Sequence, residues 1–253
     1  MELKMPNEKP RSRLPKASDI LADQIRGRIL GDGLTPGTSL PSEVDLIEES
    51  EFSRSTVREA LRLLEAEGLI EIRRGPRGGI KVRHPDAGHV GRSLALMMTL
   101  SQAPLWQLFE FRMIVEPEAA AAAAVRLTPK ERKEVLKAID EDMDIVEFHR
   151  QIGIWSGNEM MNVVLAAVHD VVRWHVLREA LTEEDVAATK AVHIKIARAI
   201  AEGKGRLAAT HMRKHLESFQ RLMKEQGRLD KPIVPRQTWQ RSSSGAHSDG
   251  HPY

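Results

Sequence analysis

The sequence predicts a mainly α protein in two parts: three helices with two short strands, then an antiparallel bundle of helices. Aromatic residues make up only 4% of the 253 residues, while alanine is frequent, and this composition favours helices over sheets. Between 87 and 228 apolar residues recur at helical spacing, with proline, glycine and hydroxyl residues at the expected helix ends. Two short apolar runs, 69–73 and 80–82, flank a glycine-rich turn and indicate paired strands.

Composition narrows the class of protein. The chain has no cysteine, which excludes disulfides and thiolate metal sites and is compatible with a reducing cytoplasm, the location we expect. No apolar run approaches the roughly 18–20 residues of a membrane span, so no membrane partner is expected. The net charge of +2 hides an uneven distribution, because residues 73–83 carry basic side chains without an acid and residues 43–51 are acidic.

Residues 53–67 are predicted to form one helix with a different role for each face. Ser53 is placed to cap its start, and Gly68 is placed to end it in a left-handed conformation. Its predicted buried stripe is Val57, Ala60, Leu61 and Leu64.

A second face of this helix is cationic. Arg54, Arg58 and Arg62 are four residues apart and therefore line up, while Ser55 and Thr56 supply short hydroxyls near the helix start. Such a face suits the DNA major groove, where arginine binds guanine and hydroxyls reach phosphates or base edges. The alternative is a surface helix whose arginines are only solvated.

The flanking segments complete a small domain. Helices are expected near 18–31 and 42–50, the second with Ser42 and Asp45 as a capping pair. The turn between the two strands contains Arg77, Gly78 and Gly79, whose backbone can approach a minor groove. An ordinary hairpin turn is the alternative.

Residues 15–84 resemble the winged helix-turn-helix of GntR bacterial transcriptional regulators, through the run PGxxLPSE…SRSTVREALRLLEAEGLIE…RGxxGGIxV. The resemblance implies a homodimer that reads a palindromic double-stranded operator, usually as a repressor. It implies DNA contacts from Ser53, Arg54, Ser55, Thr56, Arg58, Arg62, Arg77, Gly78 and Gly79. The chain departs from the family at Val44, where an arginine is usual.

Residues 85–228 are predicted to form an all-α domain, which the resemblance makes the effector-binding and dimerisation domain. A flexible arm (1–14) is expected before the DNA-binding domain (15–84), and a disordered tail (229–253) after the all-α domain. Pro117 is expected to kink one helix. The expected helices are 87–101, 104–126, 129–151, 158–178, 182–202 and 204–226.

This helical region resembles the FCD domain of FadR-like regulators, through Glu110-Phe111-Arg112, Glu116-Pro117-Glu118, Phe148-His149 and the segments around His193 and His215. Many FCD domains hold a divalent metal through one aspartate and three histidines, with an organic-acid effector or water. The resemblance implies His149, His193 and His215 as ligands, with zinc or nickel the expected ions.

The carboxylate ligand is missing from its family position, which Ile145 occupies. The open alternatives are Asp144, His211, a three-histidine site completed by water, or a site without metal. By resemblance, Arg112 is the candidate to bind an effector carboxylate. Its alternative is a buried salt bridge to Glu110 or Glu116.

Two other functions remain as alternatives to a metal-dependent regulator of organic-acid type. One is a metal-free regulator with an apolar or acyl effector, which Ile145 permits. The other is a metal-dependent hydrolase built on His211 and His215, but this pair lacks the glutamate of an HExxH enzyme, so we do not expect an enzyme.

Overall fold

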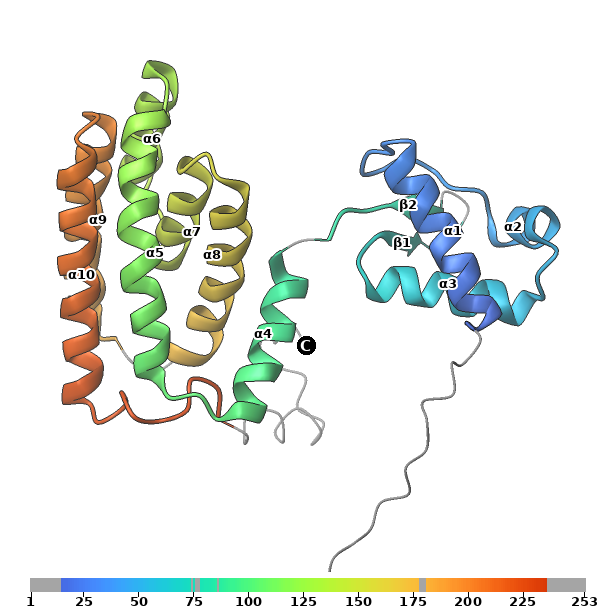
Figure 1. Cartoon of the computed structure of the whole chain (residues 1–253). Helices are drawn as coiled ribbons and strands as arrows, with labels where there is room; N and C mark the ends of the chain where they lie inside the picture. Colours follow the sequence, from blue (N-terminus) through green and yellow to red (C-terminus); the bar gives the residue numbers. More distant parts are fainter. Residues whose placement is uncertain (1–14, 74, 76–77, 86, 178–180, 236–253) are drawn as a thin grey trace, which may run out of the picture. The chain divides into compact units, whose positions relative to one another are not determined.

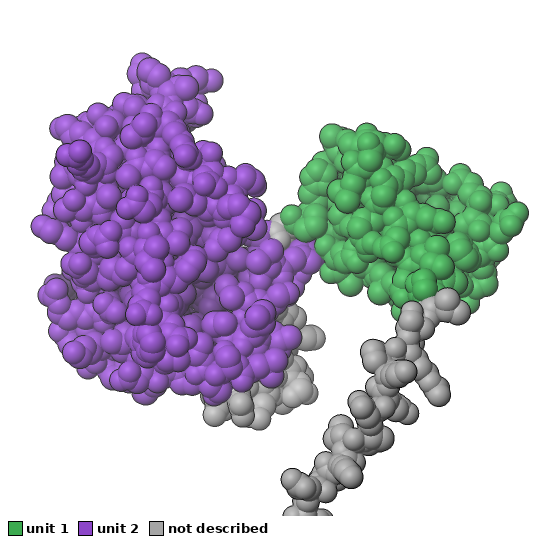
Figure 2. Space-filling view, in the orientation of Figure 1, with its two compact units in different colours: residues 1–86 green, residues 87–253 purple. Residues whose placement is uncertain are grey.

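The computed structural model describes residues 15–73, 75, 78–85, 87–177 and 181–235. It divides the chain into two compact units, residues 1–86 and 87–253 (Figures 1 and 2). The predicted arm (1–14), Arg77 and residues 236–253 of the predicted tail lie outside the described residues. No helix in the described part of the chain is long and apolar enough to cross a membrane.

The first unit consists of three helices and a two-stranded antiparallel sheet. Strand β1 pairs with β2 so that Ile70 lies opposite Val82 and Arg73 opposite Gly79. Apolar residues from all three helices and both strands form one buried core. The mainly α prediction with a two-stranded wing is therefore confirmed. The elements are α1 (Ala17–Gly31), α2 (Glu43–Ser50), α3 (Arg54–Ala66), β1 (Ile70–Arg73) and β2 (Gly79–Val82).

Local hydrogen bonds explain where α2 and α3 begin and end. Ser42 and Asp45 form a reciprocal capping box at the start of α2. The hydroxyl of Ser53 accepts from the backbone N–H of Thr56 and caps α3. At the other end Gly68 has φ +73°, and the N–H groups of Gly68 and Leu69 donate to carbonyls of the last turn. This is a Schellman ending, which requires the left-handed residue that glycine supplies.

The segment that precedes α2 lies along the free edge of β2. The N–H of Leu40 donates to the carbonyl of Ile80, and Val82 exchanges hydrogen bonds with Thr38 and Gly37. Leu40 is buried in the core. These bonds attach the two strands of the wing to the segment that leads into α2.

The second unit is a helical bundle arranged around α5, which packs against α7, α8, α9 and α10 (Figure 1). Helix α4 packs on α8, and α6 packs on α9. A π-helical turn directly continues α8. The elements are α4 (Ala87–Ser101), α5 (Leu105–Arg126), α6 (Pro129–Asp140), α7 (Ile145–Trp155), α8 (Glu159–Val171), η1 (Val172–Val176), α9 (Glu183–Ala201) and α10 (Gly205–Glu225).

The expected single helix over 129–151 was wrong, because the chain breaks between α6 and α7. Asp142 adopts a left-handed conformation with φ +62°. Asp144 then caps α7, since its carboxylate accepts from the N–H groups of Val146 and Glu147. The break turns the chain so that α7 starts as a separate helix of the bundle.

Helix α5 continues through Pro117, which lies buried within it. A proline has no N–H, so the carbonyl four residues earlier, that of Met113, loses its helical donor. The guanidinium of Arg213 on α10 lies 3.4 Å from this carbonyl and donates to it. Helix α10 thus replaces the missing hydrogen bond at the expected kink.

The disordered tail predicted over 229–253 starts too early in the chain, because its first residues are packed against the bundle. Residues 229–235 pack against the start of α5, where the N–H groups of Leu105 and Trp106 donate to the carbonyls of Lys231 and Leu229. Ile233 and Val234 are buried in a core shared with α4 and α8. The apolar pair Ile233-Val234 offsets the ordering of this otherwise polar segment.

Candidate DNA interface and histidine centre

Helix α3 has the two faces that its sequence predicts. Val57, Ala60 and Leu64 are completely buried, while Arg54, Arg58 and Arg62 are exposed. Arg62 lies 3.7 Å from Glu59 and its side chain is 70% exposed, so this ion pair is loose and screened. The arginines are therefore free to exchange their weak partners for an anionic ligand.

The start of α3 gathers hydroxyl groups. The hydroxyl of Ser53 lies 2.9 Å from that of Ser55 and 2.8 Å from that of Thr56. Ser53 and Ser55 are exposed and Thr56 is half-buried. Hydroxyls and unpaired backbone N–H groups at a helix N-terminus favour a phosphate. Of the predicted wing residues, Gly78 is half-buried and Gly79 is exposed with φ +122°.

Val44 lies on the first turn of α2 with 55% of its side chain exposed. The neighbouring Glu43 lies 3.9 Å from Arg58 of α3, so this turn borders the cationic face. An apolar side chain here replaces a charged one beside the arginines. The side chain of Val44 has no donor or acceptor for a hydrogen bond to a DNA base, but it can contact a thymine methyl group.

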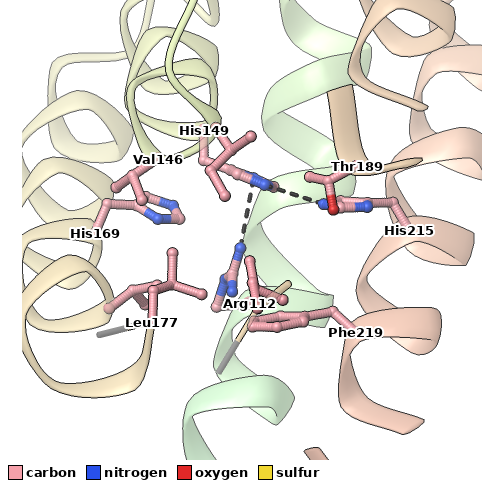
Figure 3. Close-up of a pocket in the computed structure, with 11 residues that line it drawn as sticks. Arg112, Val146, His149, His169, Leu177, Thr189, His215 and Phe219 are labelled. Atoms are coloured by element: carbon pink, nitrogen blue, oxygen red, sulfur yellow. Dashed lines mark hydrogen bonds between the residues drawn. The ribbon is translucent and has the colours of Figure 1, made fainter. Parts of the chain in front are cut away.

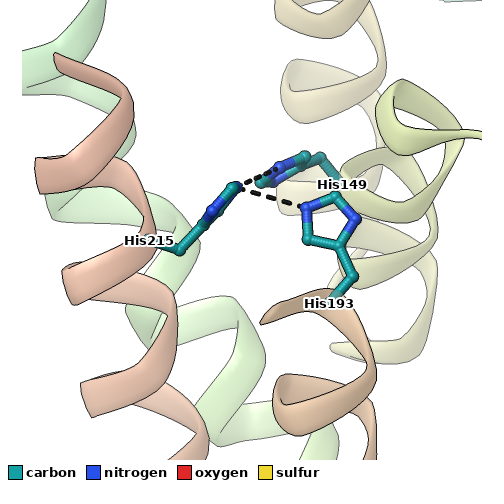
Figure 4. Close-up of side chains that lie close together, drawn as sticks. All are labelled: His149, His193 and His215. Atoms are coloured by element: carbon teal, nitrogen blue, oxygen red, sulfur yellow. Dashed lines mark hydrogen bonds between the residues drawn. The ribbon is translucent and has the colours of Figure 1, made fainter. Parts of the chain in front are cut away.

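Three histidines from three helices converge in the bundle (Figure 4). His149 comes from α7, His193 from α9 and His215 from α10, and all three are buried. Nε2 of His215 lies 3.1 Å from Nε2 of His149 and 3.2 Å from Nε2 of His193. The three ligand nitrogens lie within 4.8 Å of one another. The structure thus brings together the three histidines that the resemblance implies as metal ligands.

Hydrogen bonds alone do not satisfy the nitrogen atoms of these three histidines. A neutral imidazole carries one N–H, so Nε2 of His215 can donate to His149 or accept from His193, but not both. Nδ1 of His193 is buried without a hydrogen bond. Zinc–nitrogen bonds of about 2.0–2.1 Å place neighbouring ligand nitrogens about 3.4 Å apart in a tetrahedron. The observed 3.1 and 3.2 Å are close to that spacing, so the donor set fits a divalent cation.

Glu116 of α5 fixes the orientation of His149. It is fully buried, and its Oε2 lies 2.6 Å from Nδ1 of His149. Because an ionised carboxylate only accepts, Nδ1 must carry the proton, and Nε2 is left with its lone pair toward His215. A carboxylate behind a histidine is the usual outer support of a metal ligand.

Arg112 balances the charge of Glu116. Its Nε donates to Oε1 of Glu116 at 2.5 Å, and its side chain is 3% exposed. Burial alone would raise the pKa of Glu116, but the charge of Arg112 and the hydrogen bond from His149 hold it well below its ordinary value. The carboxylate is therefore ionised.

Burial also keeps the imidazoles neutral. It lowers the pKa of His215 to about 3 and that of His169 to about 4, and it lowers those of His149 and His193 as well. Neutral imidazole is the form that binds metals.

Asp144 and His211, the two candidates for a fourth ligand, lie away from the three histidines. The carboxylate of Asp144 is occupied, since it caps α7 and accepts from Arg173 at 2.8 Å, and it is in neither group of candidate ligands found in the described residues. His211 is half-buried and also outside both groups. The structure therefore does not bring either alternative fourth ligand to the histidines. Ile145 lies on the wall of the adjoining pocket.

A pocket that is partly open to solvent adjoins the histidines (Figure 3). Arg112, His149, His169, Thr189 and His215 supply its polar wall. The apolar wall consists of Ile145, Val146, Val172, Leu177, Leu181 and Phe219. Arg112 lines the pocket while it is bonded to Glu116, so the buried salt bridge considered from the sequence is formed and the guanidinium still faces ligand space. The pocket combines a cationic end with an apolar one.

Sequence reasoning missed His169. It comes from α8, is 1% exposed, and its ring lies parallel to that of His149 with centroids 5.1 Å apart. With Glu116 and His149 it forms the second group of candidate ligands, but Arg112 already holds the carboxylate there and would repel a cation. The signal was available, because Leu165, Val168, His169 and Val172 follow the spacing of a buried helical stripe.

Comparisons with known proteins agree with both units. The model of the gntR family of bacterial regulatory proteins matches residues 17–82, and that of the FCD domain matches residues 107–218. LutR of Bacillus subtilis, a helix-turn-helix transcriptional regulator, is 27% identical over 204 residues, which are 74% of this chain and 92% of LutR. The Exu regulon transcriptional regulator of Escherichia coli is 26% identical over 216 residues, covering 78% and 81%. The matched families and relatives are transcriptional regulators and not enzymes.

A third relative is the provisionally named regulatory protein of the L-lactate dehydrogenase operon of Escherichia coli, 30% identical over 169 residues. That match covers 62% of this chain and 66% of the relative, just under two thirds of its length. Among solved structures, a GntR protein of Streptococcus agalactiae aligns with a TM-score of 0.58 and 25% identity, over 81% of this chain and 99% of that one.

Proposed function

Since this chain belongs to the GntR family of bacterial regulatory proteins and carries an FCD domain after its winged helix unit, we propose that it regulates transcription in response to a small carboxylic acid. The observation that carries the proposal is the pocket lined by Arg112, His149 and His215, two of the three convergent histidines. The acid would bind there, and the first unit would bind operator DNA as part of a homodimer.

The DNA-binding half of the proposal is supported by the exposed arginine face of α3. Arg54, Arg58 and Arg62 would enter the major groove, and the hydroxyls at the start of the helix would hold a phosphate. Gly78 and Gly79 would let the wing approach the minor groove, and Arg77, which precedes them in the sequence, is the proposed contact there. Two copies related by a twofold axis would read the two halves of a palindrome.

The effector half is supported by the fit of the histidines to a divalent cation. His149, His193 and His215 would hold the ion, with zinc and nickel both suited to imidazole ligands. When bound, the metal supplies a positive coordination position for one carboxylate oxygen. Arg112 would pair with the carboxylate, Glu116 would keep His149 in the correct tautomer, and the apolar wall would exclude water from the rest of the acid.

The route from effector to DNA runs through α8 and α4. Helix α8 carries His169 into the pocket wall. Helix α4 packs on α8 and begins at Ala87, where the first unit ends. An acid that binds one arrangement of α8 more tightly than another would shift the population of α4 positions, and so the spacing of the two DNA-binding units. Release of a repressor from its operator is the expected result.

A metal-free regulator with an apolar effector is the second candidate. Ile145 favours it, because an apolar residue lines the pocket at the position where the FCD pattern has its carboxylate. Leu177, Leu181 and Phe219 extend the same apolar wall. This candidate predicts that the protein purifies without metal and binds acyl compounds better than short acids.

Selection from a random duplex library with the full-length chain tests the proposed function. The expected product is a palindrome whose binding weakens steeply as salt increases. Zinc-loaded protein on that duplex should then be released by a short carboxylic acid and not by the matching primary alcohol. Recovery of no preferred sequence would contradict the DNA-binding half, and indifference to every acid tested would contradict the effector half.

A further inference from the structure

Val44 is an exposed apolar side chain on the helix that precedes α3. Helix α2 buries Leu46 in the core of the first unit and packs Ile47 against that core, but 55% of Val44 stays exposed. A single exposed apolar residue is ordinary on a protein surface. What Val44 can do therefore depends on where it lies and on which chemical groups surround it.

The first turn of α2 lies beside the cationic face of α3. Oε2 of Glu43, the residue before Val44, is 3.9 Å from Nε of Arg58. The reciprocal capping box of Ser42 and Asp45 fixes the direction of this turn. Val44 thus borders the surface that would enter the major groove, without belonging to the core that positions α3.

The surroundings of Val44 disfavour a DNA phosphate as its partner. Its aliphatic side chain has no hydrogen-bond donor and no charge. Hydrogen bonds from the hydroxyl and the backbone N–H of Ser42 hold the pKa of Asp45 below its ordinary value, so this neighbouring carboxylate is ionised. Glu43 places a second carboxylate on the same turn, and negative charges repel a phosphate.

The major groove offers one apolar group, which is the C5 methyl group of thymine. The other groups that base pairs present there are hydrogen-bond donors and acceptors, which valine cannot satisfy. An exposed valine gains free energy by leaving water against that methyl group, and an apolar contact of this size is worth about fourfold in affinity. Thymine is therefore the base that the chemistry of Val44 fits.

We propose that Val44 is a specificity-determining residue whose side chain contacts the methyl group of one thymine in each half of the operator. The inference rests on the proposed DNA-binding function, because Val44 reaches a base only when α3 lies in the major groove. An arginine at this position would favour guanine, which presents two acceptors. Valine instead favours a T·A pair over a G·C pair, and thymine over uracil, which lacks the methyl group.

The test removes the methyl group from the DNA and shortens the side chain of the protein in turn. Uracil replaces each thymine of the selected duplex, one symmetric pair at a time, and fluorescence anisotropy with the full chain measures the affinity. In the wild type, one such pair should weaken binding about 15-fold, or about fourfold for each half-site. In Val44→Ala the thymine duplex should bind more weakly, and the same uracil pair should change the affinity about twofold or less.

Two further variants separate a base contact from a general effect on binding. Val125→Ala makes the same change at a side chain of α5 that is 72% exposed and belongs to the second unit, so its response to uracil should match that of the wild type. Val44→Arg, put through the same selection, should exchange the thymine for guanine at that position. Val44 and Val125 are both exposed, so none of these changes leaves a cavity.

Uracil effects that are equal in the wild type and Val44→Ala at every pair would overturn the inference, as would an unchanged base preference in Val44→Arg. In either case, loss of binding in Arg54→Ala on the selected duplex would leave the proposed function standing. If the library yielded no preferred duplex, the proposed function would fail and the inference with it.

Discussion

Glu116 of α5 and His149 of α7 are joined by a 2.6 Å hydrogen bond within the bundle core. The contact fixes the proton of His149 on Nδ1 and directs its Nε2 at His215, 3.1 Å away. Arg112 holds the other oxygen of the same carboxylate. One buried ion pair thus sets the geometry of the proposed metal ligands, which makes Glu116 the first residue to change.

Glu116→Gln should weaken both metal binding and folding. It removes the charge that orients His149, so zinc affinity is expected to fall about 10–100-fold. It also leaves Arg112 buried without its partner, which typically costs about 3–5 kcal/mol of unfolding free energy. Chelator competition and urea unfolding measure the two effects. Glu118→Gln, an exposed change on the same helix, is the control, and equal zinc affinity in the two variants would contradict the orienting role.

Ile145→Asp should strengthen metal binding. Residue 145 lies one helical turn before His149 and lines the pocket, so a carboxylate there would reach the ion as a fourth protein ligand. We expect at least about a tenfold gain in zinc affinity. Ile154→Asp adds the same charge at an exposed position of α7 and should give no gain. A gain of equal size in both variants would mean that only the overall charge matters.

Arg54→Ala and Arg58→Ala should each abolish operator binding while the fold survives. Both side chains are exposed, so their removal leaves no cavity. Fluorescence anisotropy on the selected duplex measures operator binding, with circular dichroism to check folding. Arg206→Ala on exposed α10 surface is the control, and unaffected binding in both α3 variants would contradict the assignment of the arginine face.

Two glycine substitutions in the first unit should have opposite effects. Gly68→Ala forces alanine to φ +73° and is expected to lower the unfolding free energy by about 1 kcal/mol. Gly27 is exposed within α1, and an added methyl group would meet nothing within 4 Å. Gly27→Ala should therefore raise the unfolding free energy by about 0.5–1 kcal/mol. Urea unfolding of the full chain compares them, and changes of the same sign would contradict the Schellman ending of α3.

The first unit was predictable from sequence because its signals are local. The cap at Ser53, the helix end at Gly68 and the buried stripe of α3 each depend on residues a few positions apart. Each has the predicted role in the structure. The break before α7 was missed although its signal is present. Asp144 and Glu147 have the spacing of a capping pair, but the continuous apolar pattern of 135–146 concealed it.

The histidine centre was predictable only in part. His149, His193 and His215 were named by resemblance, and their convergence depends on how three separate helices pack. His169 and the orienting role of Glu116 depend on the same long-range packing, which helical periodicity places on a buried face but does not pair. Ile233 and Val234 were assigned to a tail for the same reason, because the core that they join is formed largely by helices far earlier in the chain, α4, α5 and α8.

Metal content tests the proposed three-histidine centre most directly. The full chain would be purified without a histidine tag and compared with His193→Ala by elemental analysis, with His89→Ala, outside both groups of candidate ligands, as the control. We expect about one zinc or nickel ion per chain in the wild type and the control, and none in His193→Ala. Metal-free wild-type protein that also fails to take up zinc would contradict the metal centre and favour the apolar effector.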